Sequence, residues 1–320
     1  MLDISICMVT YNHEAFIAKA IEGVLMQETS YSYKLIIGED CSQDSTRQIC
    51  ETYAAKYPDK IMLLNSKKNL GAGNNFLRVL DECKGNYIAL CEGDDYWIDK
   101  NKLQKQIEFL EKNNNYSLCF HDVYHESNGK RKKSSLWDSP DTSDLNYLLS
   151  HKGYISTLSV VFRNDISIFS FLKESLESPF SDFFLYVALA KLGLFKFFPK
   201  RMGVYSVHTG GVWSSLGFIK AMQNTVKGYQ ILSNLLTEEE KELLKVKYLL
   251  LLEDYYMSDK ILEYEVNDQI FINNDIYVDE YIIKFIKNSC EHRKKMSYYV
   301  TSVPFNLLVK AVLKKVKNKF

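Results

Sequence analysis

Three carboxylates lie within four residues, directly after a short apolar run. Glu92, Asp94 and Asp95 follow residues 87–91, which are apolar enough to form a buried strand. Like charges brought to one point repel each other, so the cluster calls for a compensating cation. Hard oxygen ligands favour Mg²⁺ or Mn²⁺, and such an ion can hold a diphosphate and neutralise a departing nucleotide. The alternative is a solvated acidic turn that caps the next helix.

Polar residues also follow two other apolar runs. Thr10-Tyr11-Asn12 comes after residues 4–9, and Glu39-Asp40 comes after residues 34–38. Ligands of an open α/β sheet bind beyond the carboxyl ends of its strands, and the expected topology places all three ends at one edge. Asp40 could accept a hydrogen bond from a base N–H, and Tyr11 could stack on a base. A helix-capping loop and a half-buried aromatic are the respective alternatives.

Alternating strands and amphipathic helices must position these side chains. The hydrophobic pattern predicts strands at residues 4–9, 34–38, 61–64, 87–91 and 117–120, and helices at residues 14–27, 42–56, 74–83 and 102–112. Asp44 or Ser45 is expected to cap the second helix. This alternation predicts an α/β fold with a mostly parallel, doubly wound sheet.

The pattern changes after about residue 125. Residues 126–144 are rich in Ser, Asp, Lys and Gly and predict a flexible loop, for which an active-site lid is one interpretation. Further strands are expected at 156–163 and 203–207, a helix at 181–192, and helices from about 215 to 290. The chain therefore divides into residues 1–125, residues 126–215, a helical C-terminal extension at 216–292 and a tail at 293–320.

The ordered motifs resemble glycosyltransferase family 2. They are Thr10-Tyr11-Asn12, Glu39-Asp40-Cys41-Ser42-Gln43-Asp44-Ser45-Thr46, Asn69-Leu70-Gly71 and Glu92-Gly93-Asp94-Asp95-Tyr96-Trp97. A looser match continues through residues 157–163, Ser181-Asp182 and residues 205–213. The resemblance implies a GT-A fold, inversion at the anomeric carbon, and a role like that of bacterial relatives that build surface polysaccharides, often on lipid carriers.

The same resemblance implies donor and metal ligands. Tyr11 and Asp40 would hold the base, usually uracil, and the remaining donor-side residues are Thr10, Asn12, Asn75, Glu92 and Asp94. A Mn²⁺ or Mg²⁺ ion would be bound by Asp94 or Asp95, between which the sequence does not choose, with His208 completing the site. A satisfied strand-end histidine is the alternative for His208.

The resemblance also implies a catalytic base. Asp182 would take the proton of the acceptor hydroxyl from the side opposite the leaving diphosphate. A helix N-cap is the alternative for Asp182, and both roles can coexist. Trp97 and Trp213 are candidates for an acceptor platform, although core packing is the usual role of aromatic residues.

Composition and charge limit the remaining possibilities. Forty basic and forty acidic residues give a net charge of zero, which provides no electrostatic case for nucleic acid. Seven scattered cysteines without a CxxC pair indicate reduced thiols in a cytoplasmic protein. No signal peptide and no membrane span are expected.

The tail carries most of the charge asymmetry. Residues 293–320 hold eight basic residues and no acidic one. Phe305, Leu308 and Val312 fall on one helical face, which predicts an amphipathic helix that docks on an anionic membrane surface, such as the inner face of the plasma membrane. A solvated or partner-packed helix is the alternative.

Two other functions use similar residues. A sugar-1-phosphate nucleotidyltransferase also combines an α/β sheet, a metal and acids, but Thr10-Tyr11-Asn12-His13-Glu14 lacks the glycine-rich, basic phosphate loop that it needs. A non-catalytic nucleotide-sugar-binding protein would keep the fold without the acids or the base. The intact acidic cluster and Asp182 favour an enzyme with a nucleotide-sugar donor and a glycan or lipid-linked acceptor.

Overall fold

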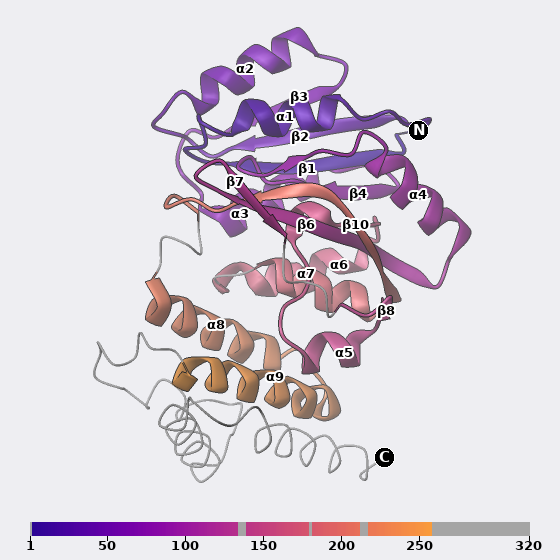
Figure 1. The fold of residues 1–320 in the computed structure, drawn as a ribbon, viewed down its shortest axis with the longest axis vertical. Coiled ribbons are helices and arrows are strands. Elements are labelled where there is room, and N and C mark those ends of the chain that lie inside the picture. Colours follow the sequence, from indigo (N-terminus) through magenta and orange to yellow (C-terminus); the bar gives the residue numbers. More distant parts are fainter. Residues whose placement is uncertain (1, 134–138, 179–180, 212–216, 258–320) are drawn as a thin grey trace. The chain divides into compact units, whose positions relative to one another are not determined.

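The computed structural model describes residues 2–133, 139–178, 181–211 and 217–257, and it contains two compact units (Figure 1). The first, here called the sheet unit, comprises residues 1–144, 154–176 and 181–215. The second, the helical unit, comprises residues 145–153, 177–180 and those from 216 onward. The sequence-based division had assigned 145–153 and 177–180 to the 126–215 segment.

One mixed sheet organises the sheet unit. The strand order is β3-β2-β1-β4-β9-β6-β10-β5, with β7 paired to β6 and β8 paired to β10. The strands are β1 (Ile4–Thr10), β2 (Tyr33–Glu39), β3 (Ile61–Asn65), β4 (Tyr87–Leu90), β5 (Tyr96–Trp97), β6 (Tyr116–Ser127), β7 (Lys130–Lys133), β8 (Thr142–Ser143), β9 (Val161–Arg163) and β10 (Leu194–Ser206). Strands β3, β2, β1 and β4 run parallel, β9 is antiparallel to both of its neighbours, and β10 runs parallel to β6.

Helices cover both faces of this sheet (Figure 1). They are α1 (Ile17–Leu25), α2 (Thr46–Lys56), α3 (Ala72–Asp81), α4 (Lys102–Lys112), α6 (Ser167–Lys173) and α7 (Ser181–Ala190). Ile17, Ile21 and Val24 of α1 recur at helical spacing and are buried in one core with alternate residues of β1, such as Ile6. The predicted α/β class with a mostly parallel, doubly wound sheet is confirmed.

Several predicted elements have different bounds in the structure. Helix α2 begins at Thr46 rather than residue 42, because residues 42–45 form a turn in which Asp44 Oδ1 accepts the N–H of Thr46 at 3.0 Å. The strand expected at 203–207 is the last part of β10. Pro199 and its basic neighbours interrupt the apolar pattern, so the earlier part of β10 was not predicted from the sequence. A register irregularity between Phe198 and Arg201 accommodates these residues in the strand.

The predicted loop at 126–144 is partly ordered strand. β6 continues to Ser127 and forms a hairpin with β7, in which Asn128 and Gly129 have positive φ angles of 49° and 71°. Such turns favour Asn-Gly, a signal that the polar composition of the segment obscured. The strand expected at 156–163 begins instead with a 3₁₀ turn, Thr157–Ser159.

The helical unit contains three described helices, α5 (Leu145–Ser150), α8 (Gly217–Ser233) and α9 (Glu238–Met257). A reciprocal cap opens α9, since Thr237 N donates to Glu240 Oε2 at 2.9 Å and Glu240 N donates to Thr237 Oγ1 at 3.3 Å. The Nζ of buried Lys247 donates to the Leu148 carbonyl at 3.0 Å and ties α9 to α5. None of the helices in the described residues has the length and apolarity needed to cross a membrane. The predicted tail, 293–320, lies outside the described residues and stays a prediction.

Candidate active site

The ends of β1, β2 and β4 meet through main-chain hydrogen bonds. Asp40 N donates to the Thr10 carbonyl at 3.1 Å, and Gly93 N donates to the Val9 carbonyl at 2.9 Å. A Cβ on Gly93 would lie 2.6 Å from Thr10 Oγ1, so only glycine lets the acidic turn pack this closely. The polar residues predicted at one sheet edge are therefore held together there.

Asp94 lies at the centre of this edge, between two imidazole rings. Its Oδ2 is 3.0 Å from Nε2 of His208, which follows β10, and 3.7 Å from Nε2 of His13, which follows β1. The two rings meet edge to face, with centroids 6.0 Å apart. Burial is the main cause that lowers the pKa of His13, partly opposed by the charge of Asp94. The neutral ring is thereby favoured, and neutral imidazole is the form that binds metals.

Asp95 occupies a different position from Asp94. It is buried, and its Oδ1 accepts the N–H of Ser206 at 2.8 Å, which fixes the end of β10. Burial, and then the charges of Asp94 and Glu92, raise the pKa of Asp95. Of the two acids that the sequence could not separate, it is Asp94 that approaches His208.

Glu92 is the acid with an unsatisfied oxygen. Its Oε2 is buried and has no hydrogen-bond partner among the described residues. Burial, then the charges of Asp94 and Asp182, raise the pKa of Glu92 to about 8. Charge accumulation of this kind is relieved when a cation binds nearby.

Asp182 lies in the first turn of α7, where its Oδ1 accepts the N–H of Phe183 at 2.8 Å. The hydroxyl of Thr157 interacts with the carboxylates of both Asp182 and Glu92. The Thr157 oxygen in turn accepts a hydrogen bond of 3.4 Å from the hydroxyl of Tyr186, one turn after Asp182. Burial raises the pKa of Asp182. Asp182 therefore accepts a main-chain N–H in the first turn of its helix, and its charge acts on Glu92 of the acidic turn. Its role as the catalytic base stays a prediction.

The base-side residues differ in accessibility. Tyr11 is 39% exposed and can stack on a planar ring. Asn12 has a φ of 54°, and its Oδ1 accepts the N–H of Gln43 at 2.8 Å, so it joins the turns after β1 and β2. Asp40 is only 2% exposed, and its oxygens accept the N–H groups of Leu70 and Gly71 at 2.8 and 3.0 Å. Asp40 thus shapes the loop that contains Leu70 and Gly71, and its contact with a base stays a prediction.

Two predicted donor-side residues are enclosed by the protein. Asn75 is 2% exposed; its Nδ2 donates to the Gly38 carbonyl at 2.8 Å and its Oδ1 accepts from Arg78. The amide of Asn75 thus holds the end of β2, and its predicted donor-binding role stays a prediction. Thr10 is also 2% exposed and packs against Gly93, so it supports the acidic turn from behind.

Trp97, a predicted acceptor-platform residue, is also enclosed by the protein. Trp97 is 1% exposed, and its Nε1 donates to the Leu158 carbonyl at 2.8 Å. Gln106 holds the same turn by donating to the Ser159 carbonyl at 3.0 Å. Trp97 therefore anchors the 3₁₀ turn that presents Thr157, and its acceptor role stays a prediction. Trp213 lies outside the described residues, and its acceptor role stays a prediction.

Replacing Trp97 by Phe tests whether Trp97 anchors the 3₁₀ turn. The change leaves the buried Leu158 carbonyl without its donor, which is expected to lower the stability of the sheet unit by about 1–3 kcal/mol. Thermal unfolding of the variant measures this loss, and acceptor KM should stay near the wild-type value. An unchanged melting temperature with a raised acceptor KM would support the acceptor role.

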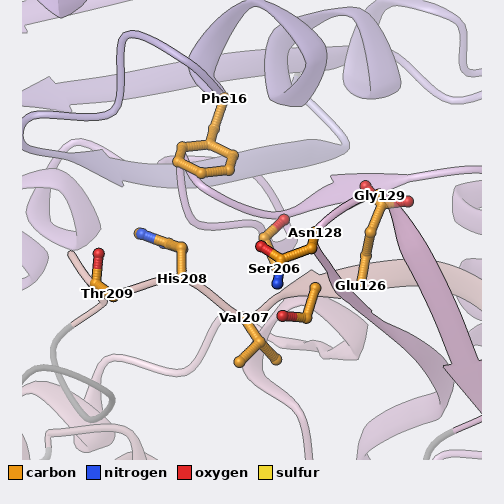
Figure 2. A pocket seen from close by; sticks show the side chains of 9 residues that line it. Phe16, Glu126, Asn128, Gly129, Ser206, Val207, His208 and Thr209 are labelled. Carbon is orange, nitrogen blue, oxygen red and sulfur yellow. The ribbon is translucent and has the colours of Figure 1, made fainter.

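A cavity of about 550 Å³ opens beside His208 (Figure 2). Its walls are Phe16, the end of β6 with the hairpin turn (Glu126, Ser127, Asn128 and Gly129), and the end of β10 with the residues after it (Ser206, Val207, His208 and Thr209). Figure 2 shows Phe16 and His208 facing each other, and their rings lie 4.5 Å apart between centroids. Ligand-binding cavities commonly have this size.

The side chains at this sheet edge fit a divalent cation that binds together with the phosphates of a substrate. Within the described ranges, no three acidic, histidine or cysteine side chains form a group that could hold a metal ion by themselves. Asp94 and His208 offer an oxygen and a nitrogen at one point, and the orphaned Glu92 oxygen lies in the same turn. Cations of this class are often held by one or two side chains together with substrate phosphates.

Two residues at this site had no predicted role. Thr157 stood in a loosely matching run, but a single hydroxyl in an apolar stretch gives no signal of function. His13 directly follows Thr10-Tyr11-Asn12, and its position next to three polar strand-end residues was the signal that could have identified it.

Comparison with known proteins places these features in context. A sequence model described as "Glycosyl transferase family 2" matches residues 5–176. An uncharacterized protein of Mycobacterium tuberculosis is 35% identical over 212 residues, which is 66% of this chain and 60% of that protein. The UDP-Glc:alpha-D-GlcNAc-diphosphoundecaprenol beta-1,3-glucosyltransferase WfgD of Escherichia coli is 31% identical in the aligned region, which is 59% of this chain and 70% of that protein. The chain thus spans about 60% of the length of the mycobacterial relative.

Solved structures share the fold. Residues 1–349 of S. aureus TarS in complex with UDP-GlcNAc align with a TM-score of 0.66 at 17% identity, covering 95% of each chain. The mannosyltransferase PcManGT of Pyrobaculum calidifontis in complex with GDP-Man and Mn²⁺ aligns with a TM-score of 0.54 at 12% identity, covering 98% of this chain and 79% of the other. The fold is that of GT-A glycosyltransferases.

Proposed function

Since the chain belongs to glycosyl transferase family 2, we propose that it is an inverting, metal-dependent glycosyltransferase. It transfers a hexosyl-type sugar from a nucleoside diphosphate sugar, with UDP as the nucleotide, to a glycan or lipid-linked acceptor in surface polysaccharide synthesis. The observation that carries the proposal is the contact of Asp94 with His208 at the sheet edge, beside a cavity. Glu92 lies in the same turn as Asp94, and its pKa is raised in part by the charge of Asp182. The ligands printed for TarS and PcManGT, and the donor named for WfgD, support the donor class.

The residues divide between donor and acceptor. Tyr11 stacks on the base, while Asp94 and His208 would hold a Mn²⁺ or Mg²⁺ ion together with the donor's diphosphate. When bound, this ion neutralises the charge that develops on the leaving diphosphate. The cavity that Phe16 and His208 line is large enough for a sugar residue. A cytoplasmic protein that docks through its tail on an anionic membrane would meet lipid-linked acceptors there.

Asp182 acts on the acceptor. The acceptor oxygen attacks the anomeric carbon and forms the new C–O bond as the bond to the diphosphate oxygen breaks, with inversion at that carbon. The hydroxyl proton passes to the Asp182 carboxylate, and the nucleoside diphosphate leaves with the electron pair. The hydroxyl of Thr157 steadies the carboxylate during this step.

Incubation with a panel of nucleoside diphosphate sugars and Mn²⁺ tests the proposal. A glycosyltransferase releases a nucleoside diphosphate, and release should increase when a suitable acceptor is added. A nucleotidyltransferase would instead form a nucleotide sugar from a sugar phosphate and a nucleoside triphosphate, with pyrophosphate as the other product. Binding of a nucleotide sugar without release under any condition would indicate a non-catalytic protein.

Thr157→Val should lower kcat by about 10- to 100-fold, because one hydrogen bond to a charged group contributes about 1.5–3 kcal/mol. Valine keeps the shape and removes the hydroxyl. Thr157→Ser, the matched control, should retain most of the activity, and donor KM should change little in either variant. A wild-type kcat in Thr157→Val would leave Thr157 a purely structural residue.

A further inference from the structure

His13 is a polar side chain at the site to which the proposed mechanism gives no role. It lies on the first turn after β1, and its main-chain N–H donates to Thr46 Oγ1, at the start of α2, over 2.8 Å. This bond fixes the backbone of His13 beside the acidic turn. The side chain is 14% exposed, and its Nδ1 is buried with no hydrogen-bond partner among the described residues. Such an orphaned nitrogen costs stability, which a function at the site would offset.

The ring of His13 points at the same oxygen as the ring of His208. Its Nε2 lies 3.7 Å from Asp94 Oδ2, and the Nε2 of His208 lies 3.0 Å from that atom. Two ligand atoms on adjacent corners around an ion, each with a bond of about 2.1 Å, are about 3.0 Å apart. Asp94 and His208 therefore already have the separation of neighbouring ligands, and His13 is farther away by about 0.7 Å.

The remaining distance can be closed by the ring itself. The described residues place no hydrogen bond on Nδ1, so none of these contacts fixes the rotation of the ring. Its neighbours are the edges of Phe16 and His208, whose centroids lie 6.5 and 6.0 Å from that of His13. Both are ring contacts that tolerate a small rotation.

We propose that His13 is a further ligand of the cation site and joins Asp94 and His208 when the donor's diphosphate brings the ion. The inference rests on the proposed function. Two imidazoles and one carboxylate form a donor set that prefers a transition-series ion such as Mn²⁺ to Mg²⁺, because Mg²⁺ is bound almost entirely by oxygen. His13 would thus determine which metal supports the reaction.

Electron spin-echo spectroscopy of Mn²⁺ tests this assignment without measuring activity. The full chain is loaded with Mn²⁺, alone and with UDP, and the histidine nitrogens bound to the ion are counted, with ¹⁵N-histidine labelling to identify them. Wild type with UDP should show two bound imidazoles, and His13→Gln should show one. His125→Gln is the matched control, because His125 packs against Tyr205. Burial lowers the pKa of His125, and the charge of Asp122 partly opposes this.

A titration of the two metals provides the second measurement. In the presence of UDP, His13→Gln should lose about tenfold or more in Mn²⁺ affinity, since loss of even an outer partner of a metal ligand often costs that much. The affinity for Mg²⁺ should change less. One imidazole in both wild type and His13→Gln would overturn the role of His13 and leave the proposed function standing. If wild type with UDP binds no Mn²⁺, the metal-dependent function itself fails together with the inference. If it binds Mn²⁺ without any histidine nitrogen, the ligand roles of both His13 and His208 fail, while metal dependence stands.

Discussion

Asp182→Asn is expected to reduce turnover by about 10² to 10⁴, the usual contribution of a general base. Asparagine keeps the shape of the side chain but cannot accept the acceptor's proton at neutral pH. Affinity for the nucleoside diphosphate with Mn²⁺ should barely change, because Asp182 acts on the acceptor. The melting temperature should also stay close to wild type, since the amide oxygen of Asn can still accept the Phe183 N–H. Turnover, nucleotide affinity and thermal unfolding are measured on one preparation.

Asp165→Asn provides the matched control. Asp165 Oδ1 accepts the N–H of Ser167 at 2.8 Å, at the start of α6, so it caps a helix of the same unit without facing the acidic turn. Its replacement should leave turnover unchanged. Near-wild-type turnover in Asp182→Asn would remove Asp182 from the mechanism and leave it as a helix cap.

The pH dependence follows from the direction of the pKa shift of Asp182. Burial raises its pKa above the ordinary 3.8, and the base works only as a carboxylate. Activity should therefore fall as the pH is lowered through this raised pKa, so the acid limb lies above that of a solvated aspartate. The residual activity of Asp182→Asn should lack this limb.

Asp94→Asn should reduce transfer about a thousandfold or more, because a bound cation contributes several kcal/mol to stabilising charge in the transition state. The nucleoside diphosphate should then bind with similar affinity in the presence and absence of Mn²⁺. EDTA should have the same effect on wild type. Calorimetry of UDP binding, with and without Mn²⁺, measures the loss. Full activity in EDTA would exclude the metal-dependent mechanism.

A variant of Asp95 tests whether the loss in Asp94→Asn comes from the missing negative charge or from the position of the missing carboxylate. Asp95→Asn removes one negative charge from the same turn, but the amide oxygen can still accept the Ser206 N–H. This variant should keep most of its Mn²⁺-dependent binding. An equal loss in Asp94→Asn and Asp95→Asn would mean that both acids contact the ion.

The sequence predicted those parts of the fold that depend on local periodicity. Ile17, Ile21 and Val24 recur at helical spacing, and the apolar run before Glu92 could form a buried strand whatever its partners. The length of β10 was not predictable in this way. Its register irregularity and Pro199 break the alternation, and pairing with β6 determines that the strand continues.

In the candidate site too, some features were predictable from the sequence, and those that depend on packing with distant residues were not. The acids at the strand ends were identified from the sequence because the sheet topology places the strand ends together, however the side chains pack. Burial was not predictable: Asn75 and Trp97 have residue types that bind ligands, yet contacts from distant segments enclose them. Thr157 is brought to the site only by folding, which places it beside Asp182. His13 lies beside Asp94 and could have been identified from the strand-end residues that it follows.

The helical unit is assembled from segments that are far apart in the chain, and this affects the order of biosynthesis. Helix α5 leaves the ribosome well before α9, whose Lys247 contacts Leu148 across 99 residues. Until α9 is made, Leu148 and Leu149 have not acquired the environment in which they are buried. The sheet unit has all of its strands by residue 206 and can form earlier. The growing chain therefore passes through a stage in which a folded sheet carries an unpartnered apolar helix, which exposes it to aggregation or chaperone capture.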